Sequence, residues 1–183
     1  WYPGMLDRGP VVLYPWVMTT PTEIPIVGNV LCFSGGKDST ALGLAMMEHG
    51  DPIAAVLVTP TGNEPLDVWS HWDRVAGMIG APIIRPMAPT LEDLIEKFDA
   101  LPNFRQRWCT RMIKIQPAIA WALRNPLATL CVGLRADEDA REGIISTSVT
   151  TRFPLREYGM GLTDVREMLV KHNITVPNRT DCE

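Results

Sequence analysis

From Asn29 onward, short apolar runs alternate with segments that have the residue pattern of helices, and this alternation is what most constrains the fold. The apolar runs are 29–33, 52–58, 82–86 and 128–133. Helices are expected over 40–49, 66–79, 90–98 and 116–123, and a last one from Thr163 or Asp164 to about His172. Short continuous apolar runs are typical of strands buried on both faces. We therefore predict an α/β fold, a doubly wound, mainly parallel sheet with helices on both faces.

The 183 residues suffice for one domain of this kind. Residues 1–28 are rich in proline, and we interpret them as an N-terminal arm. Residues 29–183 are expected to form a single domain. The sequence starts at Trp1 and ends shortly after Cys182, so we expect the C-terminal tail of this domain to be truncated here.

Charge and composition exclude several classes of protein. The formal net charge of −4 argues against a general nucleic-acid coat. No uninterrupted apolar stretch is long enough to span a membrane, and no signal peptide opens the sequence. The four cysteines form no C-x-x-C pair, which favours a reducing, cytoplasmic location. Cys32 and Cys131 lie inside apolar runs and are expected to be inert core residues.

A glycine-rich loop, Ser34 to Thr40, lies between the first predicted strand and the first predicted helix. In open α/β sheets, ligands bind at this position, outside the carboxyl ends of the strands. The glycines let backbone N–H groups approach an anion, and Lys37 adds a positive charge. Asp38 would repel a phosphate unless it caps the helix or holds a metal. The alternative interpretation is an ordinary strand–helix turn with Asp38 or Ser39 as the N-cap.

The loop lacks the spacing of a Walker A motif, because Leu31 stands where that motif needs glycine. The segment Ser34-Gly35-Gly36-Lys37-Asp38-Ser39 instead resembles the PP-loop of the adenine nucleotide alpha-hydrolase superfamily. Three further segments resemble its phosphoadenosine phosphosulfate (PAPS) reductase-like branch: 59–64, 107–117 and 133–141. The resemblance covers about Asn29 to Cys182 and identifies 29–183 as a PP-loop nucleotide-binding domain.

This resemblance implies roles for particular residues. The nucleotide would be bound by Ser34, Gly35, Gly36, Lys37, Asp38, Ser39, Thr40, Thr61, Gly62, Glu64 and Gly133. Catalytic roles fall to Lys37, Asp38, Arg135 and Arg141. Pro60 stands where the family often has an aspartate before Thr-Gly, so an acidic or metal-binding role is not expected there. The alternative for Thr61–Glu64 is a loop in which Gly62 permits a positive φ.

Two groups of charged residues accompany these motifs. Arg107, Arg111 and Lys114 would share one helix face, either as a clamp for phosphate or an acceptor substrate, or as a solvated surface. Asp137, Glu138 and Asp139 would orient the neighbouring arginines, assist a metal or cap a short helix.

The remaining candidates are cysteines, histidines and tryptophans. Iron–sulfur members of the family have cysteines near the positions of Cys109 and Cys182, so these two would hold a cluster or zinc only with ligands from a missing tail. The three histidines show no ligand spacing and are expected at the surface or at helix ends. Trp69, Trp72, Val75 and Ile79 recur at helical spacing and are expected in the core.

The resemblance leaves three functions open. The first is an enzyme that binds ATP with Mg²⁺ and adenylates an acceptor, releasing pyrophosphate, in sulfur-related chemistry. The second is a PAPS reductase, in which a cysteine thiolate attacks sulfur. The third is a non-catalytic adenine-nucleotide-binding module of a larger assembly. The acceptor, a small molecule or a nucleic acid, is not defined by the sequence, and neither is a protein partner or homo-oligomer. No membrane partner is expected.

Overall fold

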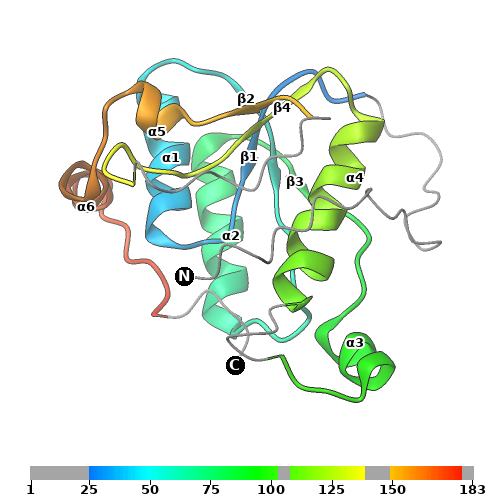
Figure 1. Ribbon diagram of the computed structural model, residues 1–183. Coiled ribbons are helices and arrows are strands. Elements are labelled where there is room, and N and C mark those ends of the chain that lie inside the picture. The colour runs from blue at the N-terminus through cyan, green and yellow to red at the C-terminus, as the bar shows by residue number, and fades with distance from the viewer. Residues whose placement is uncertain (1–24, 103–107, 139–148, 179–183) are drawn as a thin grey trace.

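The computed structural model describes residues 25–102, 108–138 and 149–178. Within these ranges, five strands form one sheet in the order β3-β2-β1-β4-β5, and all the pairings are parallel (Figure 1). The strands are β1 (Gly28–Cys32), β2 (Ile53–Leu57), β3 (Ile83–Ile84), β4 (Ala128–Cys131) and β5 (Thr151–Arg152). The predicted α/β fold with a doubly wound parallel sheet is confirmed.

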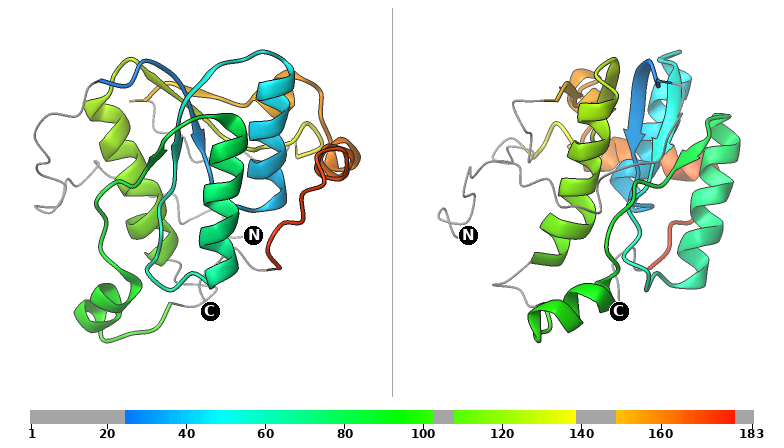
Figure 2. Two further views of the ribbon diagram at one scale, coloured as in Figure 1. Left: turned by 180° about the vertical axis from the view of Figure 1, so that it is seen from behind. Right: turned by 90° about the vertical axis from the view of Figure 1, so that its right-hand side faces the viewer.

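Helices cover both faces of the sheet, as Figure 2 shows in its right-hand view. The helices are α1 (Lys37–Glu48), α2 (Leu66–Ile79), α3 (Leu91–Phe98), the π-helical turn η2 (Thr110–Ile115), α4 (Gln116–Arg124), α5 (Pro154–Glu157) and α6 (Leu162–Lys171). One core cluster joins the sheet to α1, α2, α5 and α6, and a second joins its opposite face to α4. None of the described helices is both long and apolar enough to cross a lipid bilayer.

Side chains of β1 alternate between these two cores, as the pleat of a strand requires. Leu31 belongs to the core under α1 and α2, and Phe33, just after the strand, joins it there. Val30 is buried in the core under α4, and Cys32 packs against it. Because both faces are covered, the strand is a continuous apolar run rather than an alternating one.

The ends of two helices follow the sequence signals closely. α2 ends at Ile79, and Gly80 follows in the left-handed conformation with φ +75°. At the start of α3, Thr90 accepts a hydrogen bond from the Asp93 amide, and the Asp93 carboxylate accepts one from the Thr90 amide. This reciprocal capping box stabilises the first turn of α3.

Other boundaries differ from those predicted. α1 begins at Lys37 rather than Thr40, because Gly36 already has an extended N-cap conformation. Neither Thr163 nor Asp164 is the N-cap of α6; that residue is Gly161, whose amide donates to Asp164 at 2.7 Å. β5 and α5 were not predicted, because such short elements depend on tertiary contacts more than on local sequence. The helix considered around Arg111 and Lys114 is the π-helical turn η2 rather than an α-helix.

The strand order places a topological switch point between β1 and β4. From β1 the chain proceeds to β2 and β3 on one side, then crosses to β4 on the other side. In open α/β sheets, ligands bind in the crevice at the carboxyl ends of two such strands. The Ser34–Thr40 loop follows β1 and Arg135 follows β4, so the topology brings these two segments together.

A polar network around Arg152 of β5 reaches the amino ends of β1 and β2. The Arg152 guanidinium pairs with Asp51 at 3.0 Å and donates to Asn29 at 3.1 Å and to Glu157. Tyr158 donates its hydroxyl hydrogen to Asp51 at 2.6 Å. Hydrogen bonds from Arg152, and then from Tyr158, hold the pKa of Asp51 below its ordinary value.

We expect Arg152→Met to destabilise the protein, because Asp51 and Glu157 lose their common cationic partner. The expected loss is about 1–3 kcal/mol of the free energy of unfolding at pH 7, measured by urea denaturation. Asp51 has a lowered pKa in the folded state, so its contribution exists above about pH 4 and is lost below it. Equal stabilities of the two proteins at pH 7 would show that this network is energetically neutral.

Candidate functional site

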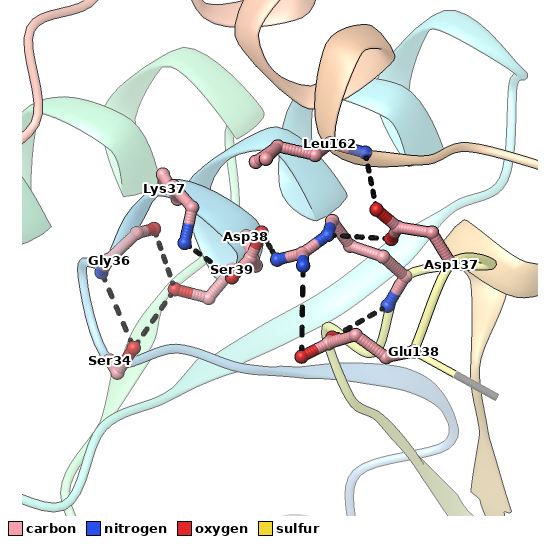
Figure 3. A network of polar contacts seen from close by, with 9 residues as sticks. Ser34, Gly36, Lys37, Asp38, Ser39, Asp137, Glu138 and Leu162 are labelled. Carbon is pink, nitrogen blue, oxygen red and sulfur yellow. Dashed lines mark hydrogen bonds and ion pairs between the residues drawn. The ribbon is translucent and has the colours of Figure 1, made fainter. Parts of the chain in front are cut away.

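The loop after β1 is organised by its two serines and two glycines. Gly35 has φ +83°, which allows the sharp turn before α1. The Ser34 hydroxyl oxygen accepts from the Gly36 amide at 3.3 Å and lies 3.2 Å from the Ser39 hydroxyl oxygen (Figure 3). Ser39 donates to the Gly36 carbonyl oxygen at 3.1 Å. Neither Asp38 nor Ser39 is the N-cap, so the alternative interpretation of this loop is wrong in that detail.

Asp38 lies between two cations at the start of α1. Its carboxylate is 2.8 Å from the Arg135 guanidinium and 3.1 Å from the Lys37 ammonium. Lys37 is exposed, whereas the Arg135 side chain is only 13% exposed. Unpaired, the Asp38 carboxylate would repel a phosphate bound at this loop. The ion pair with Arg135 partly offsets that negative charge.

Two further carboxylates hold Arg135. Asp137 accepts from the Arg135 Nε at 2.9 Å, and Glu138 accepts from the Arg135 amide at 3.2 Å. The hydrogen bond to Asp38 is the largest cause of the raised pKa of Arg135, and the bond from Arg135 lowers the pKa of Asp137. Of the roles considered for the acidic residues, orienting the arginine is the one seen here; Asp139 and Arg141 lie outside the described residues.

Sequence reasoning missed the residues that support the segment after β4. Arg156, on α5, donates to the carbonyl oxygens of Glu138 at 2.8 Å and Arg135 at 3.3 Å. The Leu162 amide at the start of α6 donates to Asp137 at 3.3 Å (Figure 3). No local signal marks Arg156, because it acts on backbone atoms about twenty positions away in the chain.

Gly133 has a packing role in this site. A Cβ atom there would lie 3.1 Å from the Asp38 carbonyl carbon and 3.2 Å from the Ser39 amide nitrogen. Glycine therefore lets the end of β4 lie directly against the first turn of α1. This close approach brings Arg135 within reach of Asp38.

The Thr61–Glu64 turn follows β2 at the same edge of the sheet. Glu64 accepts from the Thr61 amide at 2.6 Å, the Thr61 hydroxyl at 2.8 Å and the Gly62 amide at 3.1 Å. Gly62 has φ +95°, as the loop alternative anticipated. An open pocket of about 460 Å³ is lined by Gly62, Asn63, Glu64 and Pro65. The Thr61 carbonyl oxygen also accepts from the Leu91 amide, which connects this turn to α3.

His71 contradicts the expectation that the histidines lie at the surface or at helix ends. It is 6% exposed, and its Nε2 lies 3.0 Å from the Thr40 hydroxyl oxygen. Burial is the main cause of its lowered pKa. The neighbouring Trp72 lies in the core as predicted and donates its Nε1–H to the Ser34 carbonyl oxygen at 3.2 Å. His49 and His172 do lie at helix ends.

The predicted basic face falls on η2. Arg111 is exposed and Lys114 is partly buried, whereas Arg107 lies outside the described residues. Because a π-helical turn changes the angle between successive side chains, the predicted α-helical spacing of i, i+4 and i+7 does not hold here.

The described cysteines are packed in apolar surroundings. Cys109 contacts a cluster formed by α3 and η2, whose buried members are Leu91, Leu94, Met112 and Ile113. Burial raises the pKa values of Cys32 and Cys131 to about 12, as expected for inert core thiols. Within the described ranges, no group of three or more His, Cys, Asp or Glu side chains is arranged to hold a metal ion. Cys182 lies outside these ranges.

The fold defines a Rossmann-like α/β protein with a glycine loop at its switch point. A search of family models finds no match to the sequence, and no curated protein matches it. Among solved structures, it is similar to the phosphoadenylyl-sulfate (PAPS) reductase from Candida auris in its phosphate complex. The TM-score is 0.59 with 16% sequence identity, over 84% of this chain and 75% of that chain. This likeness shows a shared fold.

Gly133→Ala should lower the stability, because the added methyl group meets the backbone of Asp38. We expect a loss of about 1–3 kcal/mol in the free energy of unfolding, measured by urea denaturation. Gly77→Ala is the matched control, since Gly77 is on α2 with open space around its Cβ position. The control should stabilise the protein by up to about 1 kcal/mol. An equal gain in both variants would contradict the close packing of β4 against α1.

The buried His71 should make stability depend on pH. Its pKa is lowered in the folded state, so the unfolded chain binds the proton more tightly. Its stabilising contribution is therefore complete above about pH 6.5 and is lost as the pH falls through the folded-state pKa. In urea denaturation from pH 7.5 to 5, His71→Gln should show a shallower decrease in stability than the parent protein. Parallel curves for the two proteins would contradict a buried neutral imidazole.

Proposed function

We propose that this chain is a PP-loop enzyme that binds ATP with Mg²⁺ and adenylates an acceptor with release of pyrophosphate. One observation carries the proposal. The Ser34–Thr40 loop lies at the switch point of a parallel sheet, with Lys37 exposed beside the N-terminus of α1. Backbone N–H groups at such a helix end, together with a lysine, form a favourable site for phosphate groups.

Some residues of the site would bind the phosphate groups, and others hold the shape of the loop. Lys37 would stabilise the charge that develops on the departing pyrophosphate. Arg135 is already paired with Asp38 and Asp137, so we assign it to holding Asp38 and offsetting its charge. Ser34 and Ser39 hold the turn through the Gly36 backbone. The assignment of Arg141 remains an expectation from the resemblance.

The chemistry of this site is compatible with Mg²⁺ accompanying the nucleotide. Asp38 and Asp137 place carboxylate oxygens, the ligand type that Mg²⁺ prefers, beside the loop. In the ligand-free protein these oxygens pair with Arg135, Lys37 and the Leu162 amide, so the nucleotide phosphates would supply most of the ligands. The magnesium ion would offset negative charge on the phosphates. Lys37 and the loop backbone, held in place by the Asp38–Arg135 pair, would orient the nucleotide so that its α-phosphate is accessible to the acceptor.

We place the acceptor near η2 as part of the same proposal. α3 is joined to the Thr61 turn by the Leu91 amide, and α3 and η2 share an apolar cluster. Arg111 and Lys114 therefore lie on η2, which packs on α3 and is connected through it to the turn after β2, at the carboxyl ends of the strands. An anionic acceptor, or a phosphate that it carries, would fit these cations.

PAPS reduction is the second candidate, and the fold shared with the Candida auris PAPS reductase favours it. That reaction needs a nucleophilic thiolate. Among the described cysteines, Cys32 and Cys131 have raised thiol pKa values, and Cys109 packs against the α3–η2 cluster. The raised pKa values of Cys32 and Cys131 do not favour an activated thiolate, and Cys182 lies outside the described residues, so we rank adenylation first.

Lys37→Ala should weaken binding of ATP by on the order of ten-fold or more, because a charge-assisted contact to phosphate is lost. Isothermal titration with and without Mg²⁺ measures the affinity. Lys171→Ala is the matched control: Lys171 pairs with Glu48 at the far end of α1, roughly 18 Å along the helix. If Lys37→Ala and Lys171→Ala bind ATP equally well, the loop is not the phosphate site.

The same titration with PAPS separates the two reactions. Tighter, Mg²⁺-dependent binding of ATP favours adenylation, and tighter binding of PAPS favours reduction. ATP binding without pyrophosphate release, over a panel of candidate acceptors, would favour a non-catalytic nucleotide-binding module.

A further inference from the structure

The loop between β1 and α1 is packed on two aromatic side chains of α2. A Cβ atom on Gly35 would lie 2.7 Å from Trp72 Nε1 and 3.4 Å from His71 Cδ2. The Gly35 backbone therefore lies directly against both rings. The neighbouring Ser34 and Lys37 are exposed to solvent. The loop has one side fixed by α2 and one side open to a ligand.

Two polar contacts attach this loop at its two ends. Trp72 Nε1–H donates to the Ser34 carbonyl oxygen at 3.2 Å, where the loop begins. His71 Nε2 lies 3.0 Å from the hydroxyl oxygen of Thr40, which is fully buried in the first turn of α1. Residues between these points have few conformations left, because both ends are held by one rigid helix.

An imidazole fits the buried position between the loop and the core. One ring nitrogen bonds to Thr40, and the ring stacks on Phe33 with a centroid distance of 5.9 Å. Arg74 and Asp67 are the charged groups that act on this ring, with opposite effects on its pKa, and burial has the largest effect. A charged ring would also lie beside the positive end of α1, which disfavours protonation.

We propose that His71 and Trp72 are positioning residues that hold the phosphate-binding loop in its binding-competent shape. The inference rests on the proposed function, since it takes the loop to bind a phosphate-bearing ligand. A loop whose N–H groups are already ordered binds an anion more tightly than a flexible loop. The reason is that its binding free energy does not include the entropic cost of ordering the loop. A loosened loop should therefore lose affinity even in a fully folded protein.

The test compares three variants by titration with inorganic pyrophosphate, with folding verified by circular dichroism. His71→Phe keeps the apolar ring but removes the bond to Thr40, and it should weaken pyrophosphate binding on the order of ten-fold. His71→Gln places an amide near the position of Nε2 and should recover most of the affinity. Val75→Ala, one turn further along α2 and fully buried, should lower stability without changing affinity.

Thr40→Val removes the same hydrogen bond from the other side. Its effect on pyrophosphate affinity should match that of His71→Phe, and the double variant should bind no more weakly than either single variant. Full affinity in both His71→Phe and Thr40→Val would overturn the positioning role. Additive losses would also overturn it, since they would mean that the two residues act independently.

Hydrogen exchange in the ligand-free protein separates this inference from the proposed function. The Gly36 and Thr40 amides are hydrogen-bonded, to Ser34 Oγ and the Gly36 carbonyl oxygen respectively. They should exchange several-fold faster in His71→Phe than in the parent or in Val75→Ala. If the parent protein does not bind pyrophosphate, the proposed function is wrong. The exchange rates of these amides still test the positioning role in that case. Unchanged rates would overturn it.

Discussion

The contact between the first turn of α1 and the end of β4 is the constraint on which the candidate site depends. Gly133 lets the two backbones approach, and the Arg135 guanidinium then reaches Asp38 at 2.8 Å. This pair joins the first turn of α1 to the segment after β4, and its two residues are ninety-seven positions apart in the chain. A parallel sheet with its switch point between β1 and β4 is the arrangement that makes the contact possible.

Supporting interactions reach this contact from both sides. Arg156 and the start of α6 hold the segment after β4. His71 and Trp72 hold the loop after β1. The groups that we propose bind the ligand, chiefly Lys37 and the loop backbone, thus rest on helices that belong to the main core. A rigid support of this kind suits a site that must present several N–H groups to one anion.

Different kinds of evidence support the fold and the proposed function. The likeness to a PAPS reductase at 16% identity shows the architecture. The reaction instead depends on a few side chains, and the same fold hosts many chemistries. Burial raises the thiol pKa values of Cys32 and Cys131, and Lys37 is exposed beside a helix N-terminus, a position that suits phosphate binding.

The sequence by itself determined the α/β class, the ends of α2 and the extent of α3, because apolar runs, glycine and capping residues act within a few positions. It also placed the glycine loop after the first strand. Only the tertiary structure decided that Arg135 pairs with Asp38 and that His71 is buried against Thr40 and Phe33. Both facts depend on contacts between residues that are far apart in the chain, and local sequence patterns do not determine such contacts.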